Sequence, residues 1–446
     1  MSFTKGHGNK IVYVDYVVFA LLLVVYTGIT YWLFTKQAYG SEMLYHSDVK
    51  AYILEMQGLD SGYSFPYQLF FKFAAFLHLF IPAPEMAVTA AVTILNSCSL
   101  LAMKYYGNRL LLPVRIVWER KEDSREKSED TGRLVCGKQK KIQRSNYLPL
   151  VVTGLVFSLF FVSMLYGVGF ELPGIWRRYR GVFSPNPYHN ATYLATRPFA
   201  IVTFFVFVKI LKDYEERFCW KDVLFFGVFL FLTTVTKPSF TFILVPAAGL
   251  IMLYRLFRKK FSNFKNTLLL GISFIPTFCA LLYQFFGVFG PVEGEEKGIG
   301  FGLGKAWSYH CDNIPLAIFL GLAFPLAVLV LNFRELKKDG VFCLAWQITG
   351  VSLFEILFLY EKGFRVGHLN FSWGYMHGMF FAFTAATFLL YKKTFINEKA
   401  ELPESRTVGK RKIRLLFLLG QWGLFAVHLL LGLLYFKTML AGELYY

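Results

Sequence analysis

The chain has 446 residues, of which 55% are hydrophobic, 19% aromatic and 17% charged, and its formal net charge is +18. A water-soluble fold could not cover so much apolar surface, so the composition excludes a soluble globular protein and places most of the chain in lipid. Most of the 47 Lys and Arg residues fall in segments that the positive-inside rule assigns to the cytoplasm, so the charge reports membrane topology and no nucleic-acid partner is expected.

The first apolar run, Ile11–Phe34, is long enough to cross a bilayer as a helix. Lysines precede it and no small-residue cleavage pattern follows it, so we interpret it as a retained helix with a cytoplasmic N-terminus. A polar external stretch, 36–64, leads to the aromatic segment Phe65–Ile81, which we expect to lie as a helix along the outer interface. The second crossing is then predicted at about 85–103.

The segment 104–147 mixes many basic residues with Glu and Asp and shows no hydrophobic periodicity, which predicts a solvated cytoplasmic loop. A third apolar run, Leu148–Phe170, leads out to a polar external loop at 171–190. The run Val223–Tyr254 is interrupted by Lys237-Pro238, and a hairpin turning there keeps the following basic cluster inside. Two crossings are therefore predicted where the apolar length alone would suggest one.

The remaining apolar runs follow the same charge rule, with external loops at about 290–312 and 361–370 and the C-terminus outside. Because hydrocarbon offers the backbone no partners and the runs lack period-2 alternation, each crossing must be a helix. The sequence thus predicts an all-α, polytopic bundle of about 11 transmembrane helices. We expect 1–446 to form a single transmembrane domain in a bacterial plasma membrane, with 104–147 as the main cytoplasmic loop.

The first external loop contains His46 and Asp48, two residues apart. An Asp beyond the first helix, held near the membrane by an interfacial helix, is placed to act as a general base on an acceptor hydroxyl. The alternative is a solvated loop carboxylate with no chemical role. His46 and Asp48 could also share a metal ion, but the pair alone is a weak signal, and no C-x-x-C pair is present, so no metal site is predicted.

Cations gather in the second external loop and at the helix ends beside it. Guanidinium groups suit phosphate or carboxylate oxygens, whereas the alternative is interfacial snorkelling to lipid head groups. Two N-x-[ST] matches, Asn190-Ala-Thr192 and Asn370-Phe-Ser372, arise easily by chance and support no inference. The candidate substrate-binding residues are His46, Arg177, Arg178, Arg180, His189, Arg197 at the mouth of the fourth helix, Lys237 and Arg365.

This pattern resembles the GT-C superfamily of membrane glycosyltransferases, including its uncharacterised bacterial members. The resemblance rests on Asp48 in the first external loop, the aromatic segment opened by Phe65-Pro66-Tyr67, and the polar second external loop. It rests also on Thr236-Lys-Pro-Ser-Phe240 and Asn370-Phe-Ser-Trp-Gly-Tyr375. The superfamily's paired Asp-Glu signature is absent, because Ser47 precedes Asp48 and Val49 follows it.

The resemblance implies an inverting transfer of a sugar from a polyprenyl-phosphate donor to a glycan, lipid or protein acceptor at the outer face. Asp48 would be the base and the external cations would hold the donor phosphate. No cofactor is required by this scheme, although some relatives use a divalent cation. A polyprenyl-linked donor also suits a chain with no soluble nucleotide-sugar domain.

Two other functions remain open. An envelope polysaccharide polymerase or ligase would depend on Arg177, Arg178, Arg180 and Arg365 and little on Asp48. A glycolipid flippase would need charges facing a cavity within the bundle, and the predicted spans contain few ionisable residues, among them Glu355 and His428. A non-catalytic assembly factor would tolerate changes at all these positions.

Overall fold

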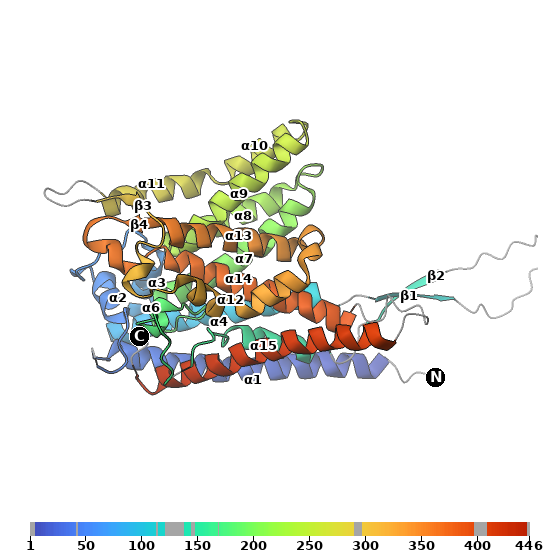
Figure 1. Cartoon of the computed structure of the whole chain (residues 1–446), viewed down its shortest axis with the longest axis horizontal. Helices are drawn as coiled ribbons and strands as arrows, with labels where there is room; N and C mark the ends of the chain where they lie inside the picture. The colour runs from blue at the N-terminus through green and yellow to red at the C-terminus, as the bar shows by residue number, and fades with distance from the viewer. Residues whose placement is uncertain are drawn as a thin grey trace, which may run out of the picture.

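The computed structural model describes residues 5–41, 43–112, 115–120, 138–143, 148–167, 169–289, 297–396 and 408–443. This part of the chain is nearly all helical, and its long helices run side by side in one bundle (Figure 1). Eight helical segments of the described residues are long and apolar enough to cross a membrane. They contain α1 (Lys5–Ala38), α4 (Pro84–Leu111), α7 (Ala191–Asp213), α9 (Ser239–Arg258), α12 (Ile314–Leu331), α13 (Gly340–Phe358), α14 (Ser372–Tyr391) and α15 (Val408–Leu440).

A ninth crossing is formed if α10 (Phe264–Ile272) and α11 (Ile275–Phe289), which are bent by 45° relative to each other, act as one span. The predicted number of about 11 also counted two shorter apolar helices, α5 (Leu148–Leu159, 12 residues) and α8 (Trp220–Thr236, 17 residues). The polytopic helical architecture is therefore confirmed, whereas the number of crossings stays a prediction.

The two ends of the bundle carry different elements. The helix α1 begins at one end of the bundle. The helix α15 ends at the opposite end, where α2 (Val49–Met56), α3 (Leu69–His78) and α6 (Arg178–Gly181) also lie (Figure 1). We call this second end the α2/α3 end. A small antiparallel ladder, β3 (Ile299–Phe301) with β4 (Leu359–Glu361), lies there too.

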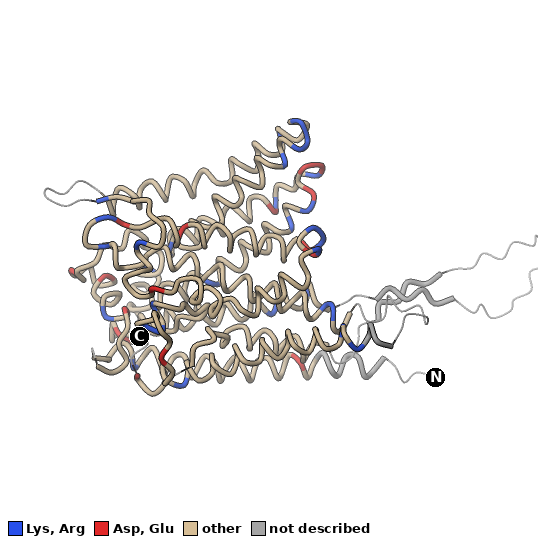
Figure 2. Tube along the Cα trace, viewed as in Figure 1, with Lys and Arg blue, Asp and Glu red and all other residues tan. Residues whose placement is uncertain are grey.

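Charged residues gather at both ends of the bundle, whereas the helix shafts are mostly uncharged (Figure 2). That distribution is the one that a bilayer core around the shafts requires. It is compatible with an integral membrane protein. Which end faces the cytoplasm stays a prediction.

The core of the bundle is built around α14, in which 19 of 20 residues are buried, and α7, in which 17 of 23 residues are buried. The helices α13 and α14 approach closely because Gly378 lacks a side chain: a Cβ there would lie 2.4 Å from Ser352 Oγ. Aromatic rings fill the space between α7 and α14, with the Phe204 and Phe381 rings stacked at 4.3 Å. These contacts give a rigid framework from which the loops at the α2/α3 end are held.

The third predicted crossing, Leu148–Phe170, is helical only as far as Leu159. Beyond it the chain leaves the helix but stays inside the bundle, where other groups satisfy its backbone. The side-chain amide of Asn186 donates to Leu159 O (3.0 Å) and Val162 O (2.9 Å), and Ser163 N donates to His428 O (3.2 Å). The predicted helix is too long at its C-terminal end because these long-range partners replace the helical hydrogen bonds.

The loop predicted at 104–147 begins later than expected, since α4 continues to Leu111. Lys104, assigned to that loop, is buried in an ion pair with Asp15. The described parts of the rest form an antiparallel pair, β1 (Arg115–Arg120) with β2 (Lys138–Gln143), and 121–137 and 144–147 lie outside the described residues. The predicted hairpin at Lys237-Pro238 is confirmed, because α8 ends at Thr236 and α9 begins at Ser239.

Short helical turns complete the described chain, and they join the longer helices at both ends of the bundle. They are η1 (Trp307–Tyr309), η2 (Phe333–Lys337), η3 (Gly363–His368) and η4 (Lys392–Ile396).

Candidate functional site

Asp48 lies at the N-terminus of α2, where the loop after α1 returns to the bundle. Its carboxylate is half-buried and accepts a hydrogen bond of 2.6 Å from the side-chain amide of Asn190. The Tyr52 hydroxyl, one helical turn on, donates to the same Asp48 oxygen at 3.4 Å. Both contacts hold the carboxylate in a fixed orientation while leaving it partly open to a reactant.

Lys237 approaches Asp48 from the turn between α8 and α9. Its ammonium donates to Asn190 Oδ1 at 3.0 Å and to Thr192 Oγ1 at 3.2 Å, and it lies 4.0 Å from the centre of the Trp373 ring. Burial lowers the pKa of Lys237 to about 7, although the nearby Asp48 opposes the shift. Near neutral pH this amine therefore exists in both charged and neutral forms, and an incoming anion would favour the charged one.

Several other predicted site residues surround this pair. His189 is buried, and its pKa is held well below the ordinary value by burial and by the charges of Arg180, Lys237 and His46. These electrostatic contacts bring His46, Arg180 and His189 into the neighbourhood of Lys237. The structure thus brings together residues from the segment after α1, the segment before α7 and the α8–α9 turn.

Arg365 approaches the same region from η3. It forms an ion pair of 3.5 Å with Glu361, and Asn370 Nδ2 donates to the same Glu361 oxygen at 2.8 Å. Burial raises the pKa of Tyr67, a hydrogen bond with Thr192 lowers it, and the charges of Asp48 and Arg365 act on it in opposite directions. Asp48 and Arg365 are thus both close enough to the Tyr67 hydroxyl for their charges to act on it.

Arg177 and Arg178 come from the same segment, 171–190, as Arg180. Arg178 begins α6 and places its guanidinium 5.4 Å from the Tyr166 ring centre. Burial lowers the pKa of His310, and Arg180 and Arg177 lower it further, so these two arginines lie close to that imidazole. The charge of Arg180 thus acts on both His189 and His310, and that of Arg177 acts on His310.

The sequence places Arg197 at the mouth of the fourth helix, but the structure places its side chain inside the bundle. It lies in the second turn of α7, is fully buried and packs against the rings of Phe160, Tyr193 and Phe380 at 4.9 to 5.4 Å. Its guanidinium donates to Pro185 O at 3.5 Å. Residue 197 follows the start of α7 at Ala191 closely, but the buried segment 183–190 covers that end of the helix.

Sequence reasoning missed the residue that joins the site together, Asn190. It was noticed only as part of an N-x-[ST] match, yet its side chain is the N-cap of α7 and accepts from Tyr193 N at 2.9 Å. An Asn directly before a helical apolar run is a recognised N-cap signal and could have placed it. Its contacts with Asp48 and Lys237 could not be read from the sequence, because they join segments 142 and 47 residues apart.

Aromatic rings form one wall of the site. Tyr52 is buried and packs against Phe65 (5.3 Å), Phe70 (6.2 Å) and Phe71 (5.9 Å), and Tyr67 stacks on Phe71 at 6.1 Å. These rings come from the segment predicted to lie at the interface. They exclude water from one side of Asp48, which strengthens electrostatic interactions there.

An apolar groove adjoins this wall. It has a volume of about 270 Å³ and lies between α3, α4, α7 and α8. Thr236, one of the residues that line the groove, directly precedes Lys237, and Phe70 in the groove contacts Tyr52. The groove therefore adjoins the segments that carry Lys237 and Tyr52. It is lined by Leu69, Phe70, Phe73, Leu95, Phe199, Leu232 and Thr236.

The site does not fit a bound divalent cation. Within the described ranges no three His, Cys, Asp or Glu side chains lie together in a way that could hold a metal ion. One carboxylate and one imidazole, Asp48 and His46, supply fewer ligands than such a site uses, and Asp48 already accepts from Asn190.

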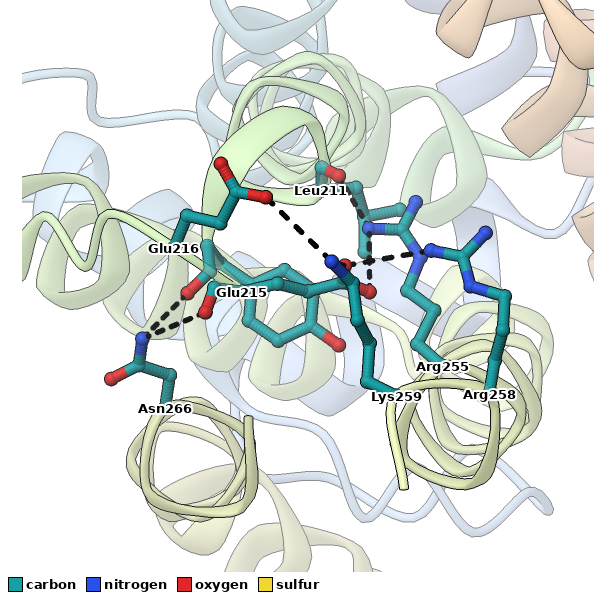
Figure 3. A network of polar contacts seen from close by, with 8 residues as sticks. Leu211, Glu215, Glu216, Arg255, Arg258, Lys259 and Asn266 are labelled. Carbon is teal, nitrogen blue, oxygen red and sulfur yellow. Dashed lines mark hydrogen bonds and ion pairs between the residues drawn. The ribbon is translucent and has the colours of Figure 1, made fainter. Parts of the chain in front are cut away.

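A second cationic cluster lies at the end of the bundle opposite the α2/α3 end (Figure 1). Arg258 and Arg255 lie 3.5 and 3.8 Å from the Glu215 carboxylate, and Lys259 pairs with Glu216 at 3.6 Å (Figure 3). These contacts tie the end of α9 to the loop after α7. Because each of these three cations already pairs with Glu215 or Glu216, the cluster is better explained as a contact between helices than as a binding site.

No protein-family model matches this chain, and no curated protein matches it either.

Proposed function

We propose that this protein is a membrane glycosyltransferase that moves a sugar from a polyprenyl-phosphate donor to an acceptor hydroxyl at the outer face of the membrane. The observation that carries the proposal is the joint attachment of Asp48 and Lys237 to Asn190, beside an apolar groove. The carboxylate can accept the proton of a hydroxyl acceptor, the cation can bind the phosphate of a lipid-linked sugar donor, and the apolar groove can hold part of the donor's hydrocarbon chain. The GT-C-like order of the external segments agrees with this assignment.

In the proposed reaction Asp48 accepts the proton of the acceptor hydroxyl as the oxygen attacks the anomeric carbon of the donor sugar. The bond between that carbon and the phosphate oxygen breaks, and its electron pair leaves with the polyprenyl phosphate. Attack from the face opposite the leaving group inverts the configuration. Lys237 stabilises the negative charge that develops on the phosphate, with Arg180 and Arg365 on the same side of the molecule.

The lipid part of the donor explains the groove. Isoprene units in the groove would exchange lipid tails for apolar side chains, so the groove would select the chain by van der Waals packing and shape and not by removal of apolar surface from water. Because Thr236 and Lys237 are consecutive, a chain in the groove places its phosphate beside the ammonium. The donor is thereby oriented before the acceptor arrives.

The test is sugar transfer by the purified protein in lipid nanodiscs, with a panel of radiolabelled polyprenyl-phosphate sugars as donors and a panel of glycan, lipid and protein acceptors. Asp48→Asn keeps the size and polarity of the side chain but cannot take a proton, so transfer should fall at least 100-fold. Asp60→Asn is the matched control, because Asp60 lies in the same loop and bonds only locally, to Gly62 N at 2.8 Å. Normal turnover by Asp48→Asn would remove the base from the proposal.

A polysaccharide polymerase or ligase is the second candidate, and the position of Arg177 and Arg180 beside His310 favours it. Such an enzyme would bind a lipid diphosphate through these arginines. Under that alternative Arg180→Ala abolishes product formation while Asp48→Asn leaves it largely intact. Loss of product formation in Asp48→Asn with product formation largely retained in Arg180→Ala supports the glycosyltransferase.

A glycolipid flippase is the third candidate retained from the sequence. It predicts movement of a fluorescent glycolipid between leaflets of proteoliposomes, with no new glycosidic bond. The proposed transferase is expected to form a glycosidic bond and not to move the glycolipid between leaflets, so this assay distinguishes a flippase from a transferase.

A further inference from the structure

Asn190 makes hydrogen bonds in two directions from one buried side chain. Its oxygen accepts from Lys237 Nζ (3.0 Å), Thr192 Oγ1 (3.1 Å) and Tyr193 N (2.9 Å). Its NH₂ group donates to Asp48 Oδ2 (2.6 Å) and to the Tyr52 hydroxyl (2.8 Å). Asn190 is 1% exposed, so water cannot replace these partners.

The orientation of the Asn190 amide is determined by its neighbours. A backbone N–H and an ammonium, both obligatory donors, face one side of the amide, and a carboxylate, an acceptor, faces the other. Rotating the amide by half a turn would place NH₂ against the Lys237 ammonium and oxygen against the Asp48 carboxylate. Both contacts would be repulsive, so only one orientation is stable.

Asn190 also keeps the acid and the amine apart. A direct ion pair would occupy both the Asp48 oxygens and the Lys237 ammonium, whereas the interposed amide leaves each with further bonding capacity. Because one side chain spans the two groups, the Asp48 carboxylate and the Lys237 amine lie within about 8 Å of each other. That distance accommodates a sugar hydroxyl and a phosphate reacting at neighbouring atoms.

We propose that Asn190 is a positioning residue that fixes the distance and orientation of Asp48 relative to Lys237. This inference rests on the function proposed above, in which Asp48 takes a proton and Lys237 binds the donor phosphate. Asn190 touches neither reacting atom in this scheme. It acts through Asp48 and Lys237.

The first experiment separates two roles of Asn190: its hydrogen bonds to both Asp48 and Lys237, and its capping of α7. Asn190→Ser retains a residue that caps helices well but cannot reach both Asp48 and Lys237. The matched control is Asn313→Ser, since Asn313 caps α12 through a bond of 3.1 Å to Leu316 N. At a temperature at which both variants are folded, we expect kcat for sugar transfer to fall at least tenfold in Asn190→Ser and to stay within twofold in Asn313→Ser. Equal kcat for the two variants would overturn the inference.

The second experiment needs no sugar transfer. Competitive labelling with acetic anhydride, followed by mass spectrometry, gives the pH at which half of the Lys237 amine is unprotonated. The titratable groups facing Lys237 are Asp48, His189 and His377, from three separate segments. Of the three, Asp48 alone stabilises the charged amine.

Asn190→Asp places a carboxylate next to the ammonium, so the labelling midpoint of Lys237 should rise by at least one pH unit. Lys209, which pairs with Asp222 at 2.7 Å, is the internal reference and should not change. An unchanged Lys237 midpoint in Asn190→Asp would show that the amide does not join the two groups. If the labelling midpoint of Lys237 rises but no donor is turned over, the contact between Asn190 and Lys237 is supported and the proposed glycosyl transfer is wrong.

Discussion

The ion pair between Asp15 and Lys104 gives a sharp test of the fold at a distance from the candidate site. Lys104 Nζ lies 3.0 and 2.8 Å from the two Asp15 oxygens, and it also donates to Thr153 Oγ1 at 2.6 Å. The Thr153 hydroxyl in turn donates to Asp15 at 2.6 Å. The three side chains thus join α1, α4 and α5, and the ion-paired side chains are only 6% and 2% exposed.

Removing one charge leaves the other buried without its counter-ion. Such a loss costs about 3 to 5 kcal/mol, whereas replacing both partners by apolar residues of similar volume is often neutral. We therefore expect Lys104→Met and Asp15→Leu each to lower the free energy of unfolding by about 3 to 5 kcal/mol. The double variant should recover at least half of that loss, because no uncompensated charge remains.

The measurement is reversible unfolding in mixed micelles with increasing dodecyl sulfate, followed by circular dichroism. Sugar transfer at a temperature where each variant is folded should be unaffected, since these residues lie far along α1 from Asp48. Single variants within 1 kcal/mol of the wild type, or a double variant whose loss is the sum of the two, would refute the reasoning.

The following outcomes are expected from the same structure. Lys237→Met should raise the KM for the lipid donor about tenfold at pH 6. In the wild type, steady-state kinetics should show the KM rising as the pH passes about 7, because Lys237 is protonated below that value and neutral above it, and this rise should be absent from the variant. Phe199→Trp narrows the groove and should raise the KM for long-chain donors more than for short-chain ones, whereas Phe225→Trp, at a position 47% exposed, should change neither. Gly378→Ala should lower unfolding stability by about 1 to 3 kcal/mol through overpacking against α13, while Gly350→Ala, whose added methyl group meets no atom within 4 Å, should not.

The architecture was largely predictable because its signals are local. Apolar length and the positions of Lys and Arg sufficed for a polytopic helical bundle and for the hairpin at Lys237-Pro238. The end of α5 was not predictable in this way. It is decided by Asn186 and His428, which bind backbone groups of the third apolar run from distant parts of the chain.

The candidate site was predictable in its residue types but not in its connections. Cations and a carboxylate in external loops stood out against the apolar background, and His46, Asp48, Arg180, His189 and Lys237 do come together. The burial of Arg197 could not be predicted, because no local sequence signal shows that the segment before α7 covers it. Asn190 was overlooked since a neutral amide gives no charge signal, although it is the contact that joins the site.

The most direct test of the central claim is single-turnover transfer from a radiolabelled polyprenyl-phosphate sugar by the purified protein, with the donor panel already described. We expect one donor to give a lipid-free or acceptor-linked product of inverted anomeric configuration, with Asp48→Asn inactive and Asp60→Asn fully active. No product from any donor, or equal product from the Asp48→Asn protein, would contradict the account.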